Sequence, residues 1–265
     1  MRAVVFDLDG TLLDEAREIS EFNRQVISKL RSRGVDIFLA SGRTYLSMLP
    51  YYRSLGLDTP LISYNGAKIV YPDGEVVESG LAPKMVDHLI QLSRSLQVHL
   101  NLYHDEVWYT EYPQSAEAFK YAETSGLAPV VPNFDLIMKS GITKALFIAP
   151  PERLHDVKLA VAQRLGDMVS VTSSMRSFLE ILKRGVNKGQ ALREVLSRYG
   201  IALADVIAFG DGLNDLEMLQ SVGLGVAMDN AYEELKSVAD DIAPHHNQGG
   251  VGVYLQRLLD SRDVR

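Results

Sequence analysis

The chain has 265 residues, 46% of them hydrophobic and 23% charged, and its formal net charge is −7. This length suits one large or two modest domains with a sizeable core, and the acidic balance without a basic run disfavours a nucleic-acid or anionic-membrane partner. The absence of cysteine excludes disulfides, zinc–thiolate sites and cysteine nucleophiles, and it fits a cytoplasmic protein.

The N-terminal part alternates strands with helices. Residues 3–6 form a continuous apolar run, which predicts a buried parallel strand ending at Asp7. The aspartates that interrupt this run are unlike a secretion signal, and no apolar stretch of the chain approaches the roughly 20 residues of a membrane span. Further along, the spacing predicts helices over 20–33 and 44–55, strands over 35–40 and 60–63, and a hairpin over 68–77.

The pattern changes after about residue 81. Pro83 can open a helix that runs to about residue 96. Residues 98–103 and 107–110 then alternate between apolar and polar, which is typical of an antiparallel hairpin. We also expect helices over 115–125 and 152–165, and strands over 143–149, 168–172 and 178–182. Together they predict a separate α/β unit with an antiparallel sheet.

From residue 187 the alternation of strands and helices returns. We expect helices over 188–199, 215–221 and 251–259, and strands over 206–209 and 223–227. Such alternation predicts an α/β fold with a Rossmann-like parallel sheet and helices on both faces. The predicted division is a catalytic core of residues 1–81 and 184–265, with residues 82–183 inserted as a cap.

Polar clusters follow several of the predicted core strands at their carboxyl ends. They are DLDGT at 7–11, SGR at 41–43, YNG at 64–66 and GDGLND at 210–215. In open α/β sheets this edge forms the ligand crevice, so we expect the clusters to meet although they are far apart in the sequence. Lys188, at the start of a predicted helix, can return to the same edge.

Three acidic side chains, Asp7, Asp9 and Asp211, would converge there. Their mutual repulsion would raise their pKa values and destabilise the fold unless a cation compensated it. A hard divalent cation with oxygen ligands does so, and Mg²⁺ is the usual one beside phosphate. A carboxylate such as Asp7 can then act as a nucleophile and form an aspartyl-phosphate.

Other side chains suit the remaining tasks of phosphate chemistry. Ser41 offers a hydroxyl followed by N–H groups that open toward a helix, and Lys188 offers a compact positive charge. Gly42 lets the backbone approach closely. Asp9 would face the same side as Asp7 if the strand geometry held, and it is the natural acid for the leaving oxygen and base for the hydrolytic water.

Four motifs occur in a fixed order along the chain: DLDGTLL at 7–13, SGR at 41–43, NKG at 187–189 and GDGLND at 210–215. Together they resemble the signature motifs of the haloacid dehalogenase superfamily. YNGA at 64–67 and the large insertion between the second and third motifs resemble its Cof-type, sugar-phosphate phosphatase-like branch. The resemblance covers essentially the whole chain, and the inserted cap is its least specific part.

The resemblance implies a role for each matching residue. Asp7 is the nucleophile and a metal ligand, and Asp9 is the acid/base and a metal ligand through its backbone carbonyl. Asp211 ligates the metal, and Asp215 supports the metal through contacts with its ligands or through water. The implied phosphate-binding residues are Ser41, Gly42, Lys188 and Asn214. The cap is implied to be a mobile lid.

Some assignments stay open at this point. Arg43 either binds substrate or pairs with an acidic residue of the core. Asn65 is a possible substrate-binding residue, although Asn-Gly alone is also a turn signal. Ser41 would by itself read as a helix cap, a role compatible with phosphate binding.

We therefore expect a cytoplasmic, Mg²⁺-dependent phosphomonoesterase acting on a small phosphorylated metabolite, such as a sugar phosphate, because a lid would obstruct a folded phosphoprotein. A phosphomutase on the same scaffold would use the same residues and differ in how well it excludes water. A non-enzymatic phospho-acceptor module is disfavoured, since such modules are single compact domains. Neither nucleic acid nor membrane is an expected partner, and the sequence indicates no oligomeric state.

Overall fold

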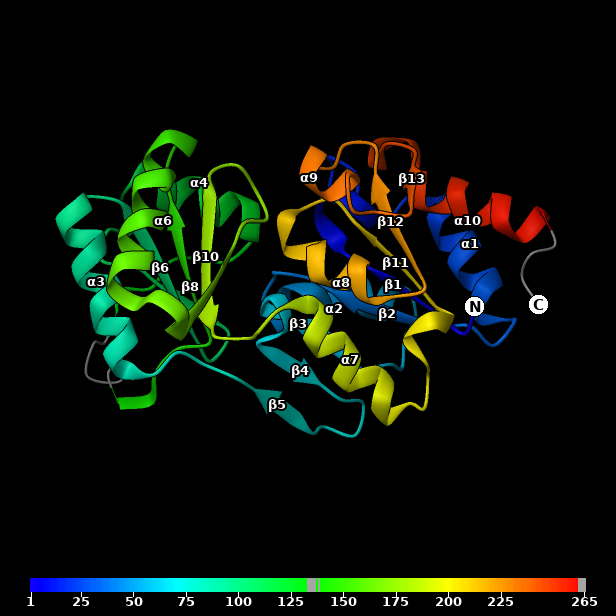
Figure 1. Cartoon of the computed structure of the whole chain (residues 1–265), viewed down its shortest axis with the longest axis horizontal. Coiled ribbons are helices and arrows are strands. Elements are labelled where there is room, and N and C mark those ends of the chain that lie inside the picture. Colours follow the sequence, from blue (N-terminus) through cyan, green and yellow to red (C-terminus); the bar gives the residue numbers. More distant parts are fainter. Residues whose placement is uncertain (133–136, 138, 262–265) are drawn as a thin grey trace.

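The computed structural model describes residues 1–132, 137 and 139–261. Within them the chain forms two sheets, each with its own helices (Figure 1). The predicted α/β fold, a parallel core with a separate antiparallel sheet, is confirmed. The division at residues 81 and 183 remains a prediction, and residues 133–136, 138 and 262–265 of the predicted cap and core lie outside the described residues.

The core sheet has eight strands in the order β13-β12-β11-β1-β2-β3-β4-β5. All neighbours from β13 to β3 pair in parallel, while β4 and β5 continue the sheet as an antiparallel hairpin. The strands are β1 (Ala3–Phe6), β2 (Asp36–Ala40), β3 (Leu61–Ser63), β4 (Lys68–Val70), β5 (Val76–Glu78), β11 (Val206–Gly210), β12 (Leu224–Met228) and β13 (Asp241–Ala243).

Helices cover both faces of this sheet, which is why β1 is buried along its whole length. One face packs against α1 (Glu21–Arg31), α2 (Tyr45–Ser54) and α10 (Gly250–Asp260). The other packs against α7 (Lys188–Arg198), α8 (Leu216–Ser221) and α9 (Glu233–Lys236). The short helical turns are Leu8–Leu12, Tyr64–Gly66, Gly166–Met168, Leu203–Asp205, Leu213–Asp215 and His246–Gln248.

The second sheet has five strands in the order β7-β6-β8-β10-β9, all antiparallel. They are β6 (His99–His104), β7 (Val107–Tyr109), β8 (Lys144–Ile148), β9 (Val169–Thr172) and β10 (Phe178–Lys183). One face packs against α3 (Pro83–Leu96) and α6 (Pro151–Leu165). The other packs on α4 (Ala116–Ser125) and on Tyr64 of the core, so this face looks toward the core sheet.

Two short elements were not predicted from the sequence. The strand β13 begins at an aspartate and has only three residues, and α9 has four. Both are too short for an apolar period to emerge. Among the residues that the structure describes, none of the helices combines the length and the apolar character that crossing a bilayer requires.

Candidate active site

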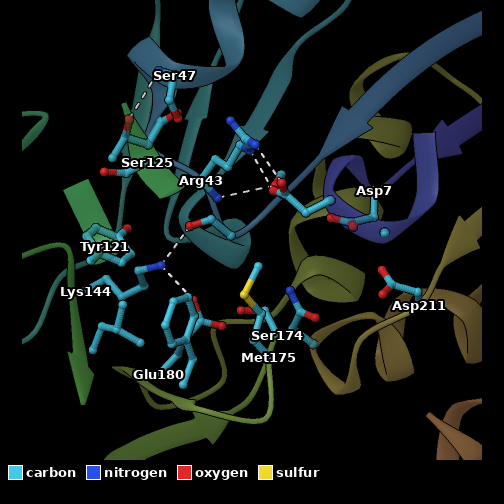
Figure 2. Close-up of a pocket in the computed structure, with 18 residues that line it drawn as sticks. Asp7, Arg43, Ser47, Tyr121, Ser125, Lys144, Ser174, Met175, Glu180 and Asp211 are labelled. Carbon is cyan, nitrogen blue, oxygen red and sulfur yellow. Dashed lines mark hydrogen bonds and ion pairs between the residues drawn. The ribbon is translucent and has the colours of Figure 1, made fainter. Parts of the chain in front are cut away.

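The predicted clusters meet at the carboxyl ends of β1, β2 and β11, which are neighbours in the core sheet. A cavity of about 170 Å³ opens at this edge, and residues of α4, β8 and β10 line its far side. Figure 2 shows Asp7 and Asp211 on one wall and Tyr121, Lys144 and Glu180 on the other. The core residues that line the cavity are Asp7, Asp9, Gly10, Ser41, Gly42, Arg43, Thr44, Ser47, Asp211 and Asn214.

Three carboxylates converge in the core wall. Oxygen atoms of Asp7, Asp211 and Asp215 lie within 4.8 Å of one another. Burial raises the pKa of Asp7 to about 7, and the negative charges of Asp215 and Asp9 act in the same direction against the Lys188 ammonium. Burial, Asp7 and Asp215 likewise raise the pKa of Asp211 far above its usual range. Both shifts come first from burial, and the neighbouring carboxylates add to them.

Lys188 supplies the positive charge closest to the cluster. It is the first residue of α7, whose N-cap Asn187 accepts a hydrogen bond from the Gln190 N–H. Its fully buried ammonium donates to Oδ1 of Asp7 at 2.5 Å and to Oδ1 of Asp215 at 2.6 Å. Burial alone would lower the pKa of Lys188, but the two carboxylates outweigh burial and raise it. Lys188 is therefore held as a cation beside Asp7.

Asp215 uses both of its carboxylate oxygens. While Oδ1 accepts from Lys188, Oδ2 accepts from the backbone N–H groups of Asp211 and Gly212, each at 3.0 Å. These bonds fix the turn after β11 that carries Asp211. In addition, the Thr11 hydroxyl donates to Oδ1 of Asp211 at 3.1 Å. The position of Asp211 is thus set from two sides.

Asp9 lies in the turn that follows β1, where its own backbone is extended with φ of −73° and ψ of 124°, and it lines the same cavity as Asp7. Its carboxylate accepts two hydrogen bonds from Arg43, from Nε to Oδ2 and from Nη2 to Oδ1, both at 2.6 Å. The Arg43 guanidinium also lies over the Tyr51 ring, 5.3 Å from its centroid. Of the two readings left open for Arg43, the structure shows the pair with an acidic core residue.

Gly10 follows Asp9 in the left-handed region with φ of 74°, and a Cβ there would lie 2.3 Å from Oδ2 of Asp211. The turn after β1 can therefore approach the carboxylate cluster only with glycine at this position.

The second motif forms a tight turn after β2. Ser41 is buried, and its hydroxyl accepts from the Arg43 N–H at 3.3 Å. It does not cap the next helix, because Thr44 is the N-cap of α2 and accepts from the Ser47 N–H. Asn65 lies behind this turn: its N–H donates to the Ser41 carbonyl at 2.9 Å, and its Oδ1 accepts from Nδ2 of Asn214 at 2.9 Å.

The polar cavity residues that the sequence analysis did not identify include Tyr121, Lys144 and Glu180. Glu180 interrupts the apolar residues of FLEILK, whereas Lys144 is the first residue of KALFI. That interruption was the available signal, since a charged residue is rarely placed inside a strand without a partner.

The donor set of the carboxylate cluster fits a hard divalent cation. It consists of oxygen atoms only, and it carries three carboxylates against one ammonium. Oxygen ligands with excess negative charge are what Mg²⁺ prefers in proteins.

Comparison with known proteins agrees with this geometry. The family of haloacid dehalogenase-like hydrolases matches residues 4–255. A relative from Yersinia enterocolitica, named HMP-PP phosphatase, is 32% identical over 98% of this chain and 96% of its own length. A solved Thermotoga maritima protein is 39% identical over 97% of each chain, with a TM-score of 0.82.

A solved haloacid dehalogenase-like hydrolase from Bacteroides thetaiotaomicron is 30% identical, with a TM-score of 0.86 over 97% of this chain and 99% of its own. The resemblance found in the sequence motifs is thus confirmed across nearly the whole chain, and so is the prediction of an enzyme, a phosphatase. The chain belongs to the haloacid dehalogenase-like hydrolases.

Proposed function

We propose that the protein is a Mg²⁺-dependent phosphomonoesterase that hydrolyses a small phosphorylated metabolite through an aspartyl-phosphate on Asp7. The observation that carries the proposal is the convergence of Asp7 and Asp211 on one wall of a cavity, with the buried ammonium of Lys188 bonded to Asp7. Nucleophile, phosphate-binding cation and metal-binding carboxylate are the three groups that phosphoryl transfer to a carboxylate requires.

In the first half of the reaction, a carboxylate oxygen of Asp7 attacks phosphorus and the bond from phosphorus to the leaving oxygen breaks. Asp9 gives that oxygen its proton. In the second half, Asp9 takes a proton from water, the water oxygen attacks phosphorus, and the acyl-phosphate bond breaks to regenerate Asp7 and release phosphate. Asp9 lines the cavity beside Asp7, as this exchange demands.

Lys188 and the second motif hold the transferring group. The Lys188 ammonium, Ser41 hydroxyl and the N–H groups of the turn that contains Gly42 offer donors for phosphoryl oxygens. Asn214, whose amide is held by Asn65, adds a polar group on the β11 side. In this proposal Asn65 acts on the substrate through Asn214 instead of binding it.

Mg²⁺ would be held by Asp7 and Asp211, with the backbone carbonyl of Asp9 as a further ligand implied by the family motif. Asp215, whose oxygens already accept from Lys188 and from the N–H groups of Asp211 and Gly212, would support the metal indirectly. When bound, it supplies charge that shields the phosphate from the carboxylates and polarises its oxygens.

The cavity favours a small leaving group, since α4 and the cap sheet line it opposite the nucleophile. The cap side of the cavity is lined by the apolar side chains of Leu146 and Phe178 and by the polar groups of Tyr121 and Ser125. HMP-PP, the compound in the name of the Yersinia relative, is a first candidate beside sugar phosphates. Action on such metabolites in the cytoplasm is part of the same proposal.

The test is phosphate release from a panel that contains HMP-PP, hexose phosphates and p-nitrophenyl phosphate, with Mg²⁺ or with EDTA. We expect Mg²⁺-dependent turnover by the wild type, and none above background by Asp7→Asn. Asp58→Asn, at an exposed aspartate far from the cavity, should match the wild type. Turnover by Asp7→Asn would refute the proposal, and conversion of hexose 1-phosphate to its 6-phosphate without phosphate release would identify a mutase.

A further inference from the structure

Two opposite charges are buried on the inner face of the cap sheet. Glu180 on β10 pairs with Leu146 on β8, and Lys144 lies two residues before Leu146, so Lys144 and Glu180 are diagonal neighbours on the same face. Their side chains are 3% and 2% exposed, and Lys144 Nζ donates to Glu180 Oε1 at 2.7 Å. Both line the cavity (Figure 2).

Each member of this pair also reaches the core. Lys144 Nζ donates to the backbone carbonyl of Gly42 at 2.7 Å, and Glu180 Oε2 accepts from Nδ2 of Asn65 at 2.9 Å. Asn65 in turn accepts from Asn214 at 2.9 Å. A continuous chain of hydrogen bonds therefore runs from the cap to the turns that follow β2, β3 and β11.

The backbone at these turns is shaped to fit the pair. A Cβ on Gly42 would lie 2.9 Å from Oδ1 of Asn65 and 3.2 Å from Oε1 of Glu180, so a larger residue would separate cap and core. Asn65 adopts φ of 56°, an uncommon value for a residue other than glycine. This conformation presents its side-chain amide between Glu180 and Asn214.

Stability does not explain why two charges occupy this place. Burying an ion pair costs desolvation, and apolar residues of similar volume are often as stabilising or more so. The surroundings would suit apolar residues, because Leu146 and Leu182 belong to the same buried cluster. Lys144 lies over the Tyr103 ring at 5.0 Å and near the Tyr64 ring at 5.9 Å, the first from the cap and the second from the core.

We propose that Lys144 and Glu180 are positioning residues that couple the seating of the cap to the geometry of the phosphate site. With the cap on the core, they fix the carbonyl of Gly42 and the Asn65–Asn214 pair; with the cap away, these core groups lose their partners. The active geometry of the Ser41–Arg43 turn then depends on the cap being in place. This inference rests on the proposed function, since it assigns that turn to phosphate binding.

The experiment uses the double variant Lys144→Met/Glu180→Leu, because removing one partner alone would leave a buried charge unpaired. We expect a melting temperature close to that of the wild type or above it. We expect kcat to fall about 10- to 100-fold, the cost of a small misplacement of reacting groups. The fall should be similar for p-nitrophenyl phosphate and for acetyl phosphate, whose leaving group is too small to contact the cap, with KM changing little.

Small-angle X-ray scattering of the same proteins gives a readout independent of turnover, and the double variant should have a larger radius of gyration. The matched control is Arg94→Met/Glu111→Leu, which removes a cap ion pair remote from the core and should leave kcat and scattering unchanged. Unchanged kcat and scattering in the Lys144/Glu180 variant would overturn the inference. So would a rise in KM confined to p-nitrophenyl phosphate, which would mark a leaving-group contact. An inactive wild type would instead refute the proposed function, and scattering would still decide whether the pair seats the cap.

Discussion

The Lys188 ammonium donates to Oδ1 of Asp7 at 2.5 Å, in a site where both side chains are buried. The same ammonium also bonds Asp215, and the carboxylate of Asp211 lies within 4.8 Å of both aspartates. The cluster thus contains one positive charge and three carboxylates. When all of them are ionised the cluster carries a charge of −2, which a single divalent cation balances.

Replacing Lys188 by methionine should remove both a phosphate-binding charge and the group that orients Asp7. We expect kcat to fall by about 10²- to 10³-fold, as for the loss of one preorganised donor at a developing charge. The melting temperature should also fall, because Asp7 and Asp215 lose their buried partner. Steady-state kinetics and thermal unfolding measure the two effects.

The double variant Lys188→Met/Asp7→Asn separates these effects. Removing one of the two unpaired carboxylates should restore part of the melting temperature while turnover stays absent. If Lys188→Met alone kept the wild-type kcat, the assignment of Lys188 to the phosphate site would be wrong.

Asp211→Asn should weaken the response to Mg²⁺ more than it alters the chemistry. The amide can still accept the hydrogen bond from Thr11, but it takes one negative charge from the proposed ligand set. We expect the Mg²⁺ concentration for half-maximal activity to rise about 10- to 100-fold, a loss of roughly 1.4 to 2.8 kcal/mol in metal binding. Saturating Mg²⁺ should recover part of the lost rate, and a titration with unchanged midpoint would contradict the role of Asp211.

Burial raises the pKa of Asp7 from its ordinary value of 3.8 to about 7. We therefore expect the stability of the metal-free protein to depend on pH. Asp7 binds its proton more tightly in the folded chain than in the unfolded one. Its contribution to the free energy of unfolding is therefore fully present below pH 4 and is lost as pH rises toward 7. Unfolding by urea in EDTA, measured from pH 5 to 8, should show this decline.

The free energy of unfolding should fall less steeply with pH in Asp7→Asn than in the wild type. This variant also removes one of the charges that raise the pKa of Asp211. Asp58→Asn should keep the wild-type slope. Mg²⁺ should stabilise the protein more at pH 8 than at pH 5, since binding requires ionised carboxylates. Identical slopes for Asp7→Asn and the wild type would assign the decline to other groups.

The sequence alone was sufficient to predict that Asp7, Ser41, Lys188 and Asp211 lie at the same edge of the sheet. Each stands at the end of an apolar run or at a helix start, and parallel strands have their carboxyl ends at one edge of the sheet, so local signals determine where these residues meet. Their catalytic roles remain proposals. The core elements were predicted for the same reason, since burial on two faces leaves continuous apolar runs such as Ala3–Phe6.

The side-chain partners that join separate turns and sheets were not predictable in this way. Whether Arg43 pairs with Asp9, and whether Glu180 reaches Asn65, depends on how turns and sheets far apart in the sequence are placed against each other. A charged residue in an apolar strand signals that some partner exists but does not identify it. The same holds for β13, whose three residues form a strand only because β12 offers an unpaired edge.

Arg43→Lys tests the remaining assignment in the site. The guanidinium holds both oxygens of Asp9 at 2.6 Å, a fork that a lysine ammonium does not reproduce. If Arg43 acts by orienting Asp9, kcat should fall about 10-fold with little change in KM. Arg43→Lys added to Asp9→Asn should then cost little more than Asp9→Asn alone, because both changes disrupt one interaction. A higher KM, and effects that multiply in the double variant, would show instead that Arg43 binds the substrate directly.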